Sequence, residues 1–538
     1  MHTVKTQPFF DQNPGTSGLR KKTKIFEKKN YAENFIQSIF DCAGPIRGKV
    51  LILGGDGRYL NKKIIQKVLK LAAGNGFSKV IVGKDGLLST PAVSNLIRKH
   101  KAMGGIILSA SHNPGGHDGD FGIKYNVENG GPAPDNLMRA IYDRSKKISR
   151  YFLAKEEDVS LVTLGIQIIA AMQVEIIDSV RDYADLMEEL FDFTAIRHAI
   201  GRGFRFRFDA MHGVTGPYAH EIFERRLGFP SGTVVNGIPL ADFGGKNPDP
   251  NLVYAKERYD MLDKGLDFAA ASDGDGDRNL LIGKGIFVNP SDSLAILAAN
   301  ARLVKGYFSG IIGVARSMPT STAVNYVADK HKFRVYETPT GWKFFSNLLD
   351  AGLVNLCGEE SFGTSSSHIR EKDGLWAILM WLNILAVTNK SVSDLVRLHW
   401  YTYGRNYYSR HDYEGVEEEV AERMINNLRM RLTDLRKTRI GNFLVKKADD
   451  FIYHDQIDNS VSVYQGIRIL FQGARMIFRI SGTGTEGATV RVYLEQYEAD
   501  SAQHDKDTQT ALSPLIRLSD EISGLKLSLK RSRPTVIT

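Results

Sequence analysis

The sequence has very little cysteine and no leader-like amino terminus. Among 538 residues only Cys42 and Cys357 are cysteines, far apart in the chain. This scarcity excludes a disulfide framework or a structural zinc site. Residues 1–22 lack the apolar core of a secretory signal. A reducing, cytoplasmic location is therefore expected.

Long apolar runs are also missing. The longest apolar stretch, LWAILMWLNILAV from Leu375 to Val387, is too short to cross a bilayer and contains Asn383. It predicts a buried helix, and no membrane role is expected.

The chain is mildly basic, with a formal net charge of +9, but it has no dense Lys/Arg block. Neither zinc-finger spacing nor an aromatic RNA-binding motif accompanies the charge. We therefore expect small anionic substrates and no nucleic-acid partner.

Strand-like runs alternate with amphipathic helical stretches, which predicts an α/β fold. The chain is too long for one core, and its length favours about three or four domains. Domain boundaries are expected near residues 175–182, 289–291 and 404–413. After the last joint, SVSVYQGIRILFQGARMIFRISGTG predicts strands with tight turns, so the carboxyl-terminal domain is expected to be smaller and α+β.

A metal site is predicted in SDGDGDRN, where Asp273, Asp275 and Asp277 alternate with two glycines. The glycines allow a tight bend that brings the three carboxylates together. An EF-hand is excluded, because its sixth and twelfth loop positions would be Arg278 and Lys284. A site that has few carboxylate ligands and leaves room for a phosphate oxygen suits Mg²⁺. The alternative is an acidic surface turn.

The segment SASHNPGG places Ser111 between a buried strand and strong turn residues. Ser111 either satisfies backbone groups in a polar turn or carries a phosphoryl group. A serine-hydrolase role fits poorly, because the Gly-x-Ser-x-Gly turn is absent.

Two further loops are candidates for holding a sugar phosphate. RISGTGTEGATVR can direct backbone N–H groups and hydroxyls at a phosphate, with Arg479 and Arg491 beside it. In CGEESFG, Glu359 and Ser361 suit neighbouring sugar hydroxyls. Trp342 in PTGWKFF either lines a sugar or belongs to the core, and Arg20, Lys124 and Lys372 are catalytic candidates or plain surface cations.

The order of the motifs resembles the phosphoglucomutases, the glucose-type branch of the alpha-D-phosphohexomutase superfamily, over nearly the whole chain. The segments that carry the resemblance are PGTSGLRKK, GGDGRY, SASHNPGG, FGIKYNVENGGPAP, DAMHGVTGPY, FGGKNPDPN, SDGDGDRN, ARSMPTS, TPTGWKFF, GEESFGTSSSHIREKDG and RISGTGTEGATVRVY. The resemblance implies four domains around a central cleft, three of related mixed α/β type plus the smaller α+β domain. We place them at 1–178 (phosphoserine loop), 179–290 (Mg²⁺ loop), 291–405 (sugar loop) and 406–538 (phosphate-binding).

The resemblance also implies a role for each motif residue. Ser111 would be the phosphoserine and, with Asp273, Asp275 and Asp277, a ligand of Mg²⁺. Lys124 and Arg278 would neutralise the phosphoryl group, and His112 and Lys372 would transfer protons or contact it. Sugar contacts would come from Thr340, Gly341, Trp342, Glu359 and Ser361. The other phosphate would be held by Arg479, Ser481, Thr483 and Arg491, and the site entrance would be shaped by Thr16, Ser17 and Arg20.

The implied activity is interconversion of glucose 1-phosphate and glucose 6-phosphate, with glucose 1,6-bisphosphate as activator and intermediate. A hexose phosphate is the expected partner, and the chain is expected to be a monomer or a weak dimer. Two alternatives stay open: a mutase for another hexose phosphate, such as mannose or N-acetylglucosamine phosphate, and a non-catalytic structural or adhesion protein.

Overall fold

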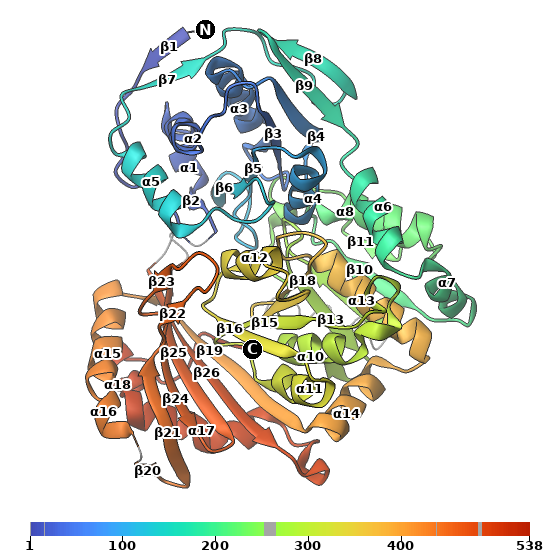
Figure 1. Cartoon of the computed structure of the whole chain (residues 1–538), viewed down its shortest axis with the longest axis vertical. Coiled ribbons are helices and arrows are strands. Elements are labelled where there is room, and N and C mark those ends of the chain that lie inside the picture. The colour runs from blue at the N-terminus through green and yellow to red at the C-terminus, as the bar shows by residue number, and fades with distance from the viewer. Residues whose placement is uncertain (1, 16, 252–264, 437, 483–486) are drawn as a thin grey trace.

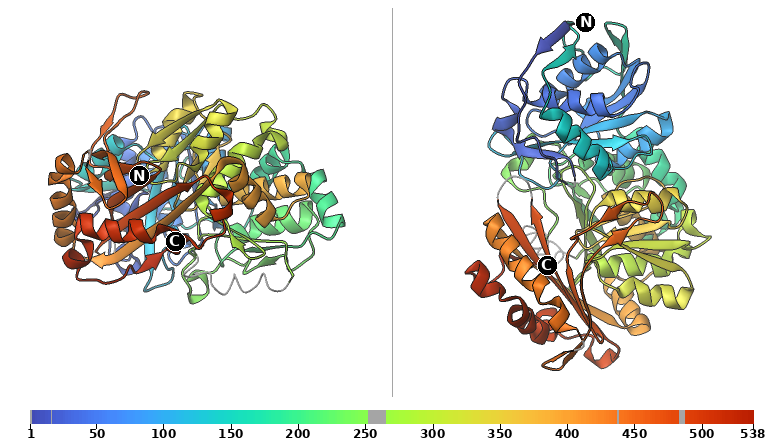
Figure 2. Two further views of the ribbon diagram at one scale, coloured as in Figure 1. Left: turned by 90° about the horizontal axis from the view of Figure 1, so that it is seen from below. Right: turned by 60° about the vertical axis from the view of Figure 1, so that its left-hand side comes forward.

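The computed structural model describes residues 2–15, 17–251, 265–436, 438–482 and 487–538. These residues form four main sheets that follow one another along the chain (Figure 1). In Figure 1 the first domain lies at the top, the second and third at the right, and the fourth at the lower left. The right-hand view in Figure 2 separates the sheets of the first and fourth domains. The predicted architecture of three α/β domains and one α+β domain is confirmed.

The first sheet has parallel central strands and antiparallel outer ones. Its strand order is β2 (Leu19–Lys22), β6 (Asp120–Val127), β5 (Gly104–Leu108), β3 (Val50–Gly55), β4 (Lys79–Leu87), β9 (Met172–Ile177) and β8 (Gly165–Ile169). Helices cover it: α2 (Tyr31–Cys42), α3 (Asn61–Asn75), α4 (Thr90–His100) and α5 (Asp135–Ser145). Both faces are buried, because Leu51 and Ile52 on β3 pack into different hydrophobic clusters.

The second and third sheets also mix parallel and antiparallel pairs. The strand order of the second sheet is β11 (Val234–Val235), β10 (Phe206–Asp209), β12 (Phe268–Ser272), β13 (Asn279–Gly283) and β14 (Ile286–Phe287). The strand order of the third sheet is β16 (Arg334–Thr338), β15 (Gly313–Ser317), β17 (Leu356–Glu359) and β18 (Gly363–Ser366). Their helices are α6 (Arg181–Leu190), α7 (Phe193–Gly201), α8 (Thr215–Ala219), α10 (Pro290–Asn300), α11 (Ala323–His331), α12 (Trp342–Asp350), α13 (Gly374–Thr388) and α14 (Val392–Tyr403).

The predicted buried helix is α13, whose Trp376 and Trp381 are fully buried. These two side chains belong to a hydrophobic cluster that joins the first three domains. Within the described residues no single helix passes the length and hydropathy test for a membrane span; only the bent pair α13 and α14 passes together.

In the fourth domain the neighbouring strands are antiparallel throughout the described residues. The strand order of its sheet is β20 (Arg439–Ile440), β21 (Phe443–Asp450), β24 (Ile467–Phe471), β25 (Ala474–Gly482), β26 (Ala488–Glu498), β19 (Arg405–Val416) and β27 (Val536–Ile537). Helices α15 (Glu418–Met430) and α17 (Thr508–Ser523) pack on it around a separate core. The fourth domain therefore has a hydrophobic core of its own.

Candidate active site

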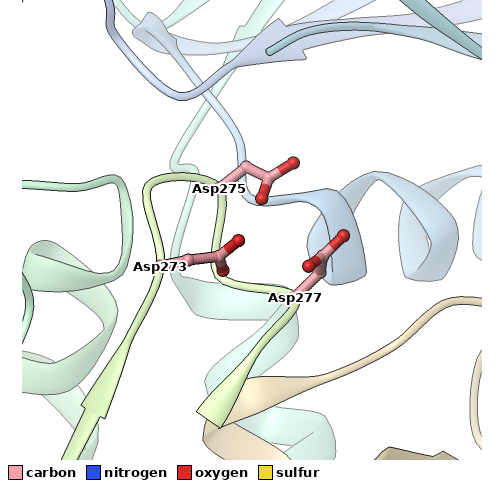
Figure 3. Close-up of side chains that lie close together, drawn as sticks. All are labelled: Asp273, Asp275 and Asp277. Carbon is pink, nitrogen blue, oxygen red and sulfur yellow. The ribbon is translucent and has the colours of Figure 1, made fainter. Parts of the chain in front are cut away.

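The three aspartates lie in the turn that joins β12 to β13, and their carboxylates point toward one another (Figure 3). One oxygen from each lies within 4.8 Å of the others, and all three side chains are buried. The conformation of this turn requires glycine at positions 274 and 276. Gly276 has a left-handed φ of +80°, and a side chain at Gly274 would come within 2.8 Å of the Ser111 carbonyl oxygen.

The free oxygens of this cluster fit a hard divalent cation. Among the described residues, Oδ1 of Asp275 and Oδ1 of Asp277 are buried and accept no hydrogen bond. Burial and the charges of Asp277 and Asp275 raise the pKa of Asp273 well above its ordinary value. These carboxylate oxygens have no hydrogen-bond donor and lie in a buried cluster of negative charge. A cation that binds them would neutralise that charge.

The second oxygen of Asp275 is held by three donors. Its Oδ2 accepts hydrogen bonds from Lys124 Nζ at 2.5 Å, from Thr90 Oγ1 at 2.8 Å and from Ser109 Oγ at 3.0 Å. Burial alone would raise the pKa of Asp275, but the charge and hydrogen bond of Lys124 outweigh it and lower that pKa. Asp275 is thus fixed as a carboxylate whose Oδ1 is left for a ligand.

Ser111 lies just beyond β5 and faces the aspartate cluster. Its backbone has a left-handed φ of 54°, which is uncommon for serine and typical of functional turns. Its Oγ donates to Asp273 Oδ2 at 2.8 Å, and its N–H donates to Ser109 Oγ at 2.7 Å. The predicted phosphoserine loop and metal loop are therefore in direct contact.

Two more predicted groups border this centre. Lys372 Nζ lies 3.3 Å from Asp277 Oδ2, and the backbone N–H of Arg278 donates to Asp273 Oδ1. Burial, followed by the charges of Arg278 and Arg20, lowers the pKa of His112 well below its ordinary value. His112 is thus a neutral imidazole at pH 7.

One cavity of about 370 Å³ collects most of the predicted site residues, from all four domains. The predicted residues that line it are Ser17, Arg20, His112, Lys124, Asp277, Arg278, Thr340, Gly341, Trp342, Glu359, Ser361, Lys372, Arg479, Ser481 and Arg491. Ser111, Asp273 and Asp275 lie beneath it and do not line it. Thr16 and Thr483 lie outside the described residues.

In the fourth domain Arg479 on β25 stands directly opposite Arg491 on β26. Like charges across neighbouring strands destabilise a sheet unless another charge compensates them. Asp412 does so for Arg491 at 3.7 Å, and both guanidinium groups also border the cavity. Ser481, two residues beyond Arg479, adds a hydroxyl. The arrangement suits a phosphate dianion.

The third domain supplies the opposite polar wall. Glu359, at the end of β17, accepts a hydrogen bond from Gly341 N–H at 2.9 Å, and Ser361 Oγ lies 3.5 Å from its other oxygen. Trp342 combines the two roles considered for it, since it packs edge-on against Phe345 and also lines the cavity.

Several site residues were not predicted from the sequence. Glu371 and Asn126 line the cavity and are hydrogen bonded at 3.0 Å, and burial raises the pKa of Glu371 to about 7. Thr90 was missed because its contact with Asp275 joins residues of different domains. The neighbouring Lys372 was the signal for Glu371, since both belong to the REKDG segment.

A buried ion pair holds the phosphoserine loop from behind. Arg58 Nη2 lies 2.8 Å from Asp56 Oδ2, and both side chains are fully buried. The same guanidinium donates to the backbone carbonyls of Ser111 at 2.9 Å and Asp120 at 2.8 Å. Arg58 therefore helps to fix the position of Ser111 relative to the aspartates.

Arg58→Met is expected to lower the free energy of unfolding by about 3–5 kcal/mol, because it leaves the Asp56 charge buried and unpaired. It should also lower kcat by about 100-fold, since a shift near 1 Å misplaces Ser111. Chemical denaturation and steady-state kinetics measure the two effects. Adding Asp56→Asn should restore much of the stability but not the activity, and equal recovery of both would contradict the positioning role.

Comparison with known proteins covers the whole chain. The family profiles "Phosphoglucomutase/phosphomannomutase, alpha/beta/alpha domain" I, II and III match residues 11–152, 181–285 and 290–403. "Phosphoglucomutase-1, C-terminal domain" matches residues 405–535.

Curated relatives are similar over their full length. A phosphoglucomutase of Rhizobium radiobacter is 60% identical over 100% of this chain and 99% of its own. Human phosphoglucomutase-1 is 50% identical with the same coverage. The Paramecium phosphoprotein pp63/parafusin, a phosphoglucomutase crystallised in an open form, has a TM-score of 0.92 at 47% identity, covering 100% of this chain and 99% of its own. The chain therefore belongs to the phosphoglucomutase/phosphomannomutase family.

Proposed function

We propose that this protein is a phosphoglucomutase that interconverts glucose 1-phosphate and glucose 6-phosphate through a phosphoserine at Ser111. The observation that carries the proposal is the cavity of about 370 Å³, which side chains from all four domains line. It joins Arg479 of β25 and Arg491 of β26 to the rim of the Ser111 and aspartate centre. Such a cavity suits a molecule with a phosphate at one end and a reacting hydroxyl at the other. Identities of 50–60% with phosphoglucomutases over the full chain support the glucose assignment.

In the first half-reaction the phosphoryl group leaves Ser111 Oγ and bonds to the free hydroxyl oxygen of the sugar phosphate. The hydroxyl proton must leave as that bond forms. His112 and Lys372 both line the cavity and are the two candidates to take it. Arg479, Ser481 and Arg491 hold the phosphate that does not react. Ser111 Oγ, freed from the broken P–O bond, takes up a proton along its hydrogen bond with Asp273 Oδ2, and the other product of this step is glucose 1,6-bisphosphate.

In the second half-reaction the bisphosphate has turned end for end, and its other phosphoryl group returns to Ser111 Oγ. The Oγ proton has an acceptor in place, because Oγ–H already donates to Asp273 Oδ2 at 2.8 Å. The sugar oxygen released by the broken P–O bond takes up a proton from the group that removed one before. Lys124 and Arg278 beside the centre stabilise the charge of the group in transfer.

Asp273, Asp275 and Asp277, with a phosphoserine oxygen, would hold Mg²⁺. When bound, Mg²⁺ supplies a Lewis acid that neutralises charge on the transferred phosphoryl group. The turning step requires that the bisphosphate stay in a site closed to water. We also propose that the four domains end at residues 178, 290, 405 and 538. The proposed location is the cytoplasm, and the proposed partners are hexose phosphates.

A coupled assay tests the proposal. Wild-type protein with glucose 1-phosphate, Mg²⁺ and a trace of glucose 1,6-bisphosphate should form glucose 6-phosphate. A chelator should abolish the activity and added Mg²⁺ should restore it. Parallel reactions with mannose 1-phosphate and N-acetylglucosamine 1-phosphate should be slower. A folded protein that prefers another sugar overturns the glucose assignment, and one that turns over none of them supports the non-catalytic alternative.

A further inference from the structure

The loop between β18 and α13 brings two side chains to the active-site cavity. Glu371 and Lys372 both line the cavity, and Lys372 Nζ lies 3.3 Å from Asp277 Oδ2. A group that acts on a substrate must be held within about 0.5 Å of its working position. Loops are usually more mobile than the elements they connect, and lysine has a flexible stem. The buried side of this loop, whose residues have no part in the proposed reaction steps, supplies the support.

A hydrogen bond between His368 and Asp373 closes the loop. His368 Nε2 lies 3.0 Å from Asp373 Oδ2, and the two side chains are 2% and 0% exposed. Glu371 and Lys372 lie between these two residues in the sequence, so the bond draws together the two ends of the segment that carries them. The backbone N–H of Asp373 also donates to the Thr364 carbonyl oxygen of β18 at 3.1 Å. A short segment closed in this way has few conformations open to it.

The Asp373 end of the loop is itself fixed to its surroundings. Asp373 Oδ1 accepts hydrogen bonds from the Trp376 N–H at 3.1 Å and from the Tyr183 hydroxyl of α6 at 2.5 Å. The aspartate therefore caps α13 and also bonds to the second domain. Next to it, the Gly374 N–H donates to the Gly276 carbonyl oxygen in the aspartate turn at 3.0 Å. The end of the loop thus has a defined place relative to the metal centre.

A chain of buried hydrogen bonds determines which nitrogen of His368 carries the hydrogen. Trp376 Nε1 donates to the Tyr307 hydroxyl at 2.8 Å, that hydroxyl is bonded to the Ser366 hydroxyl, and Ser366 Oγ lies 2.8 Å from His368 Nδ1. Because an indole N–H can only donate, every hydrogen of the chain finds an acceptor when Tyr307 donates to Ser366 and Ser366 donates to Nδ1. The histidine hydrogen is then on Nε2 and is directed at Asp373.

We propose that His368 is a positioning residue: its hydrogen bond to Asp373 holds the loop so that Lys372 lies beside Asp277 at the reacting centre. The lysine depends closely on the loop, because its stem passes over β18. A side chain at Gly363 would come within 2.3 Å of Lys372 Cδ. A small shift of the loop therefore moves Nζ away from Asp277. The kinetic consequence of such a shift rests on the proposed mutase activity, whereas the placement of Lys372 does not.

Two polar replacements separate the two hydrogen bonds of His368. An asparagine amide reaches the position of Nδ1, so His368→Asn keeps an acceptor for Ser366 but loses the donor to Asp373. A glutamine amide reaches the position of Nε2, so His368→Gln keeps that donor. Both variants lose the ring that stacks on Trp376 at 5.5 Å, and both should melt below the wild type.

The two variants should differ in turnover. His368→Asn should lower kcat about 100-fold, since a shift near 1 Å misplaces Lys372, and His368→Gln should keep most of the wild-type kcat. KM should change little, because Glu359 and Arg479 line the cavity from other segments. In a Lys372→Met background, His368→Asn should lower kcat little further, because the histidine acts through that lysine. His399→Asn is the matched control: it alters a buried histidine of α14 that packs against Tyr403 and does not line the cavity, and it should keep the wild-type kcat.

Chemical labelling of Lys372 tests its placement without any sugar. Trinitrobenzenesulfonate modifies exposed amines, and peptide mass spectrometry measures the rate at each lysine. The Lys372 side chain is 12% exposed, so it should react slowly in the wild type and in His368→Gln, and faster in His368→Asn. Melting curves check that each variant is folded at the assay temperature, and His368→Ser replaces the asparagine variant should that one misfold.

The outcomes separate this proposal from the proposed function. Equal losses of kcat in His368→Asn and His368→Gln, or additive losses with Lys372→Met, overturn the positioning role. Equal labelling of Lys372 in all three proteins overturns the placement itself. A wild-type protein that turns over no hexose phosphate overturns the proposed function instead, and the labelling rates then decide the placement of Lys372 alone.

Discussion

Replacing Ser111 with alanine is expected to lower kcat for glucose 1-phosphate by at least about 10⁴-fold, as the loss of a nucleophile typically does. The variant lacks the oxygen that donates to Asp273 Oδ2 and that would carry the phosphoryl group. Ser109 cannot replace it. Its Oγ is occupied twice, accepting from Ser111 N–H and donating to Asp275 Oδ2.

Intact mass after incubation with glucose 1,6-bisphosphate gives an independent measurement. Wild-type protein should gain one phosphoryl group, and Ser111→Ala should gain none. Ser109→Ala is the matched control, because it removes a neighbouring hydroxyl but keeps the Ser111 oxygen. It should lose activity moderately and still take up the phosphoryl group. Substantial turnover by Ser111→Ala, or phosphorylation at another residue, would contradict the proposed relay.

Local sequence patterns predicted the parts of the site that one loop builds alone. Asp273, Asp275 and Asp277 converge because their spacing and two glycines determine a single turn between β12 and β13. Arg479 and Arg491 lie opposite each other because β25 and β26 follow one another in the chain and pair antiparallel in this register. Polar residues after buried strands, such as Ser111 after β5, lie at the site as expected for an α/β sheet.

Contacts between distant segments could not be predicted in this way. Thr90 reaches Asp275 across the boundary of the first and second domains, and Arg58 reaches the Ser111 carbonyl from the loop after β3. Both side chains look ordinary in the sequence, since threonine at a helix start and arginine after a strand have common local roles. Their function depends on how the sheets pack, which no periodicity encodes.

Asp273→Asn is expected to act in opposite directions on stability and on function. The amide keeps the shape of the carboxylate and can still bond Ser111 Oγ and the Arg278 N–H. The raised pKa of Asp273 means that the metal-free wild type loses stability as pH rises above about 4, the ordinary aspartate value, toward the folded pKa. Metal-free Asp273→Asn should therefore melt at a higher temperature than metal-free wild type at pH 7. This difference should shrink as pH falls toward 4.

The same substitution should remove most of the response to Mg²⁺. A cation that binds only the folded state raises the melting temperature by mass action, so the wild type should show a rise with Mg²⁺ concentration and Asp273→Asn should not. Activity should fall at least about 100-fold, because even changes outside the ligand set cost 10–100-fold at metal sites. Asp292→Asn is the control: it removes a buried carboxylate of α10, bonded to Trp400 Nε1 at 3.0 Å, whose pKa burial raises to about 6. Both variants lose a destabilising buried charge, so their metal-free stability does not separate them, but their Mg²⁺ response and activity do. An unchanged Mg²⁺ response in Asp273→Asn would exclude the aspartate cluster as the metal site.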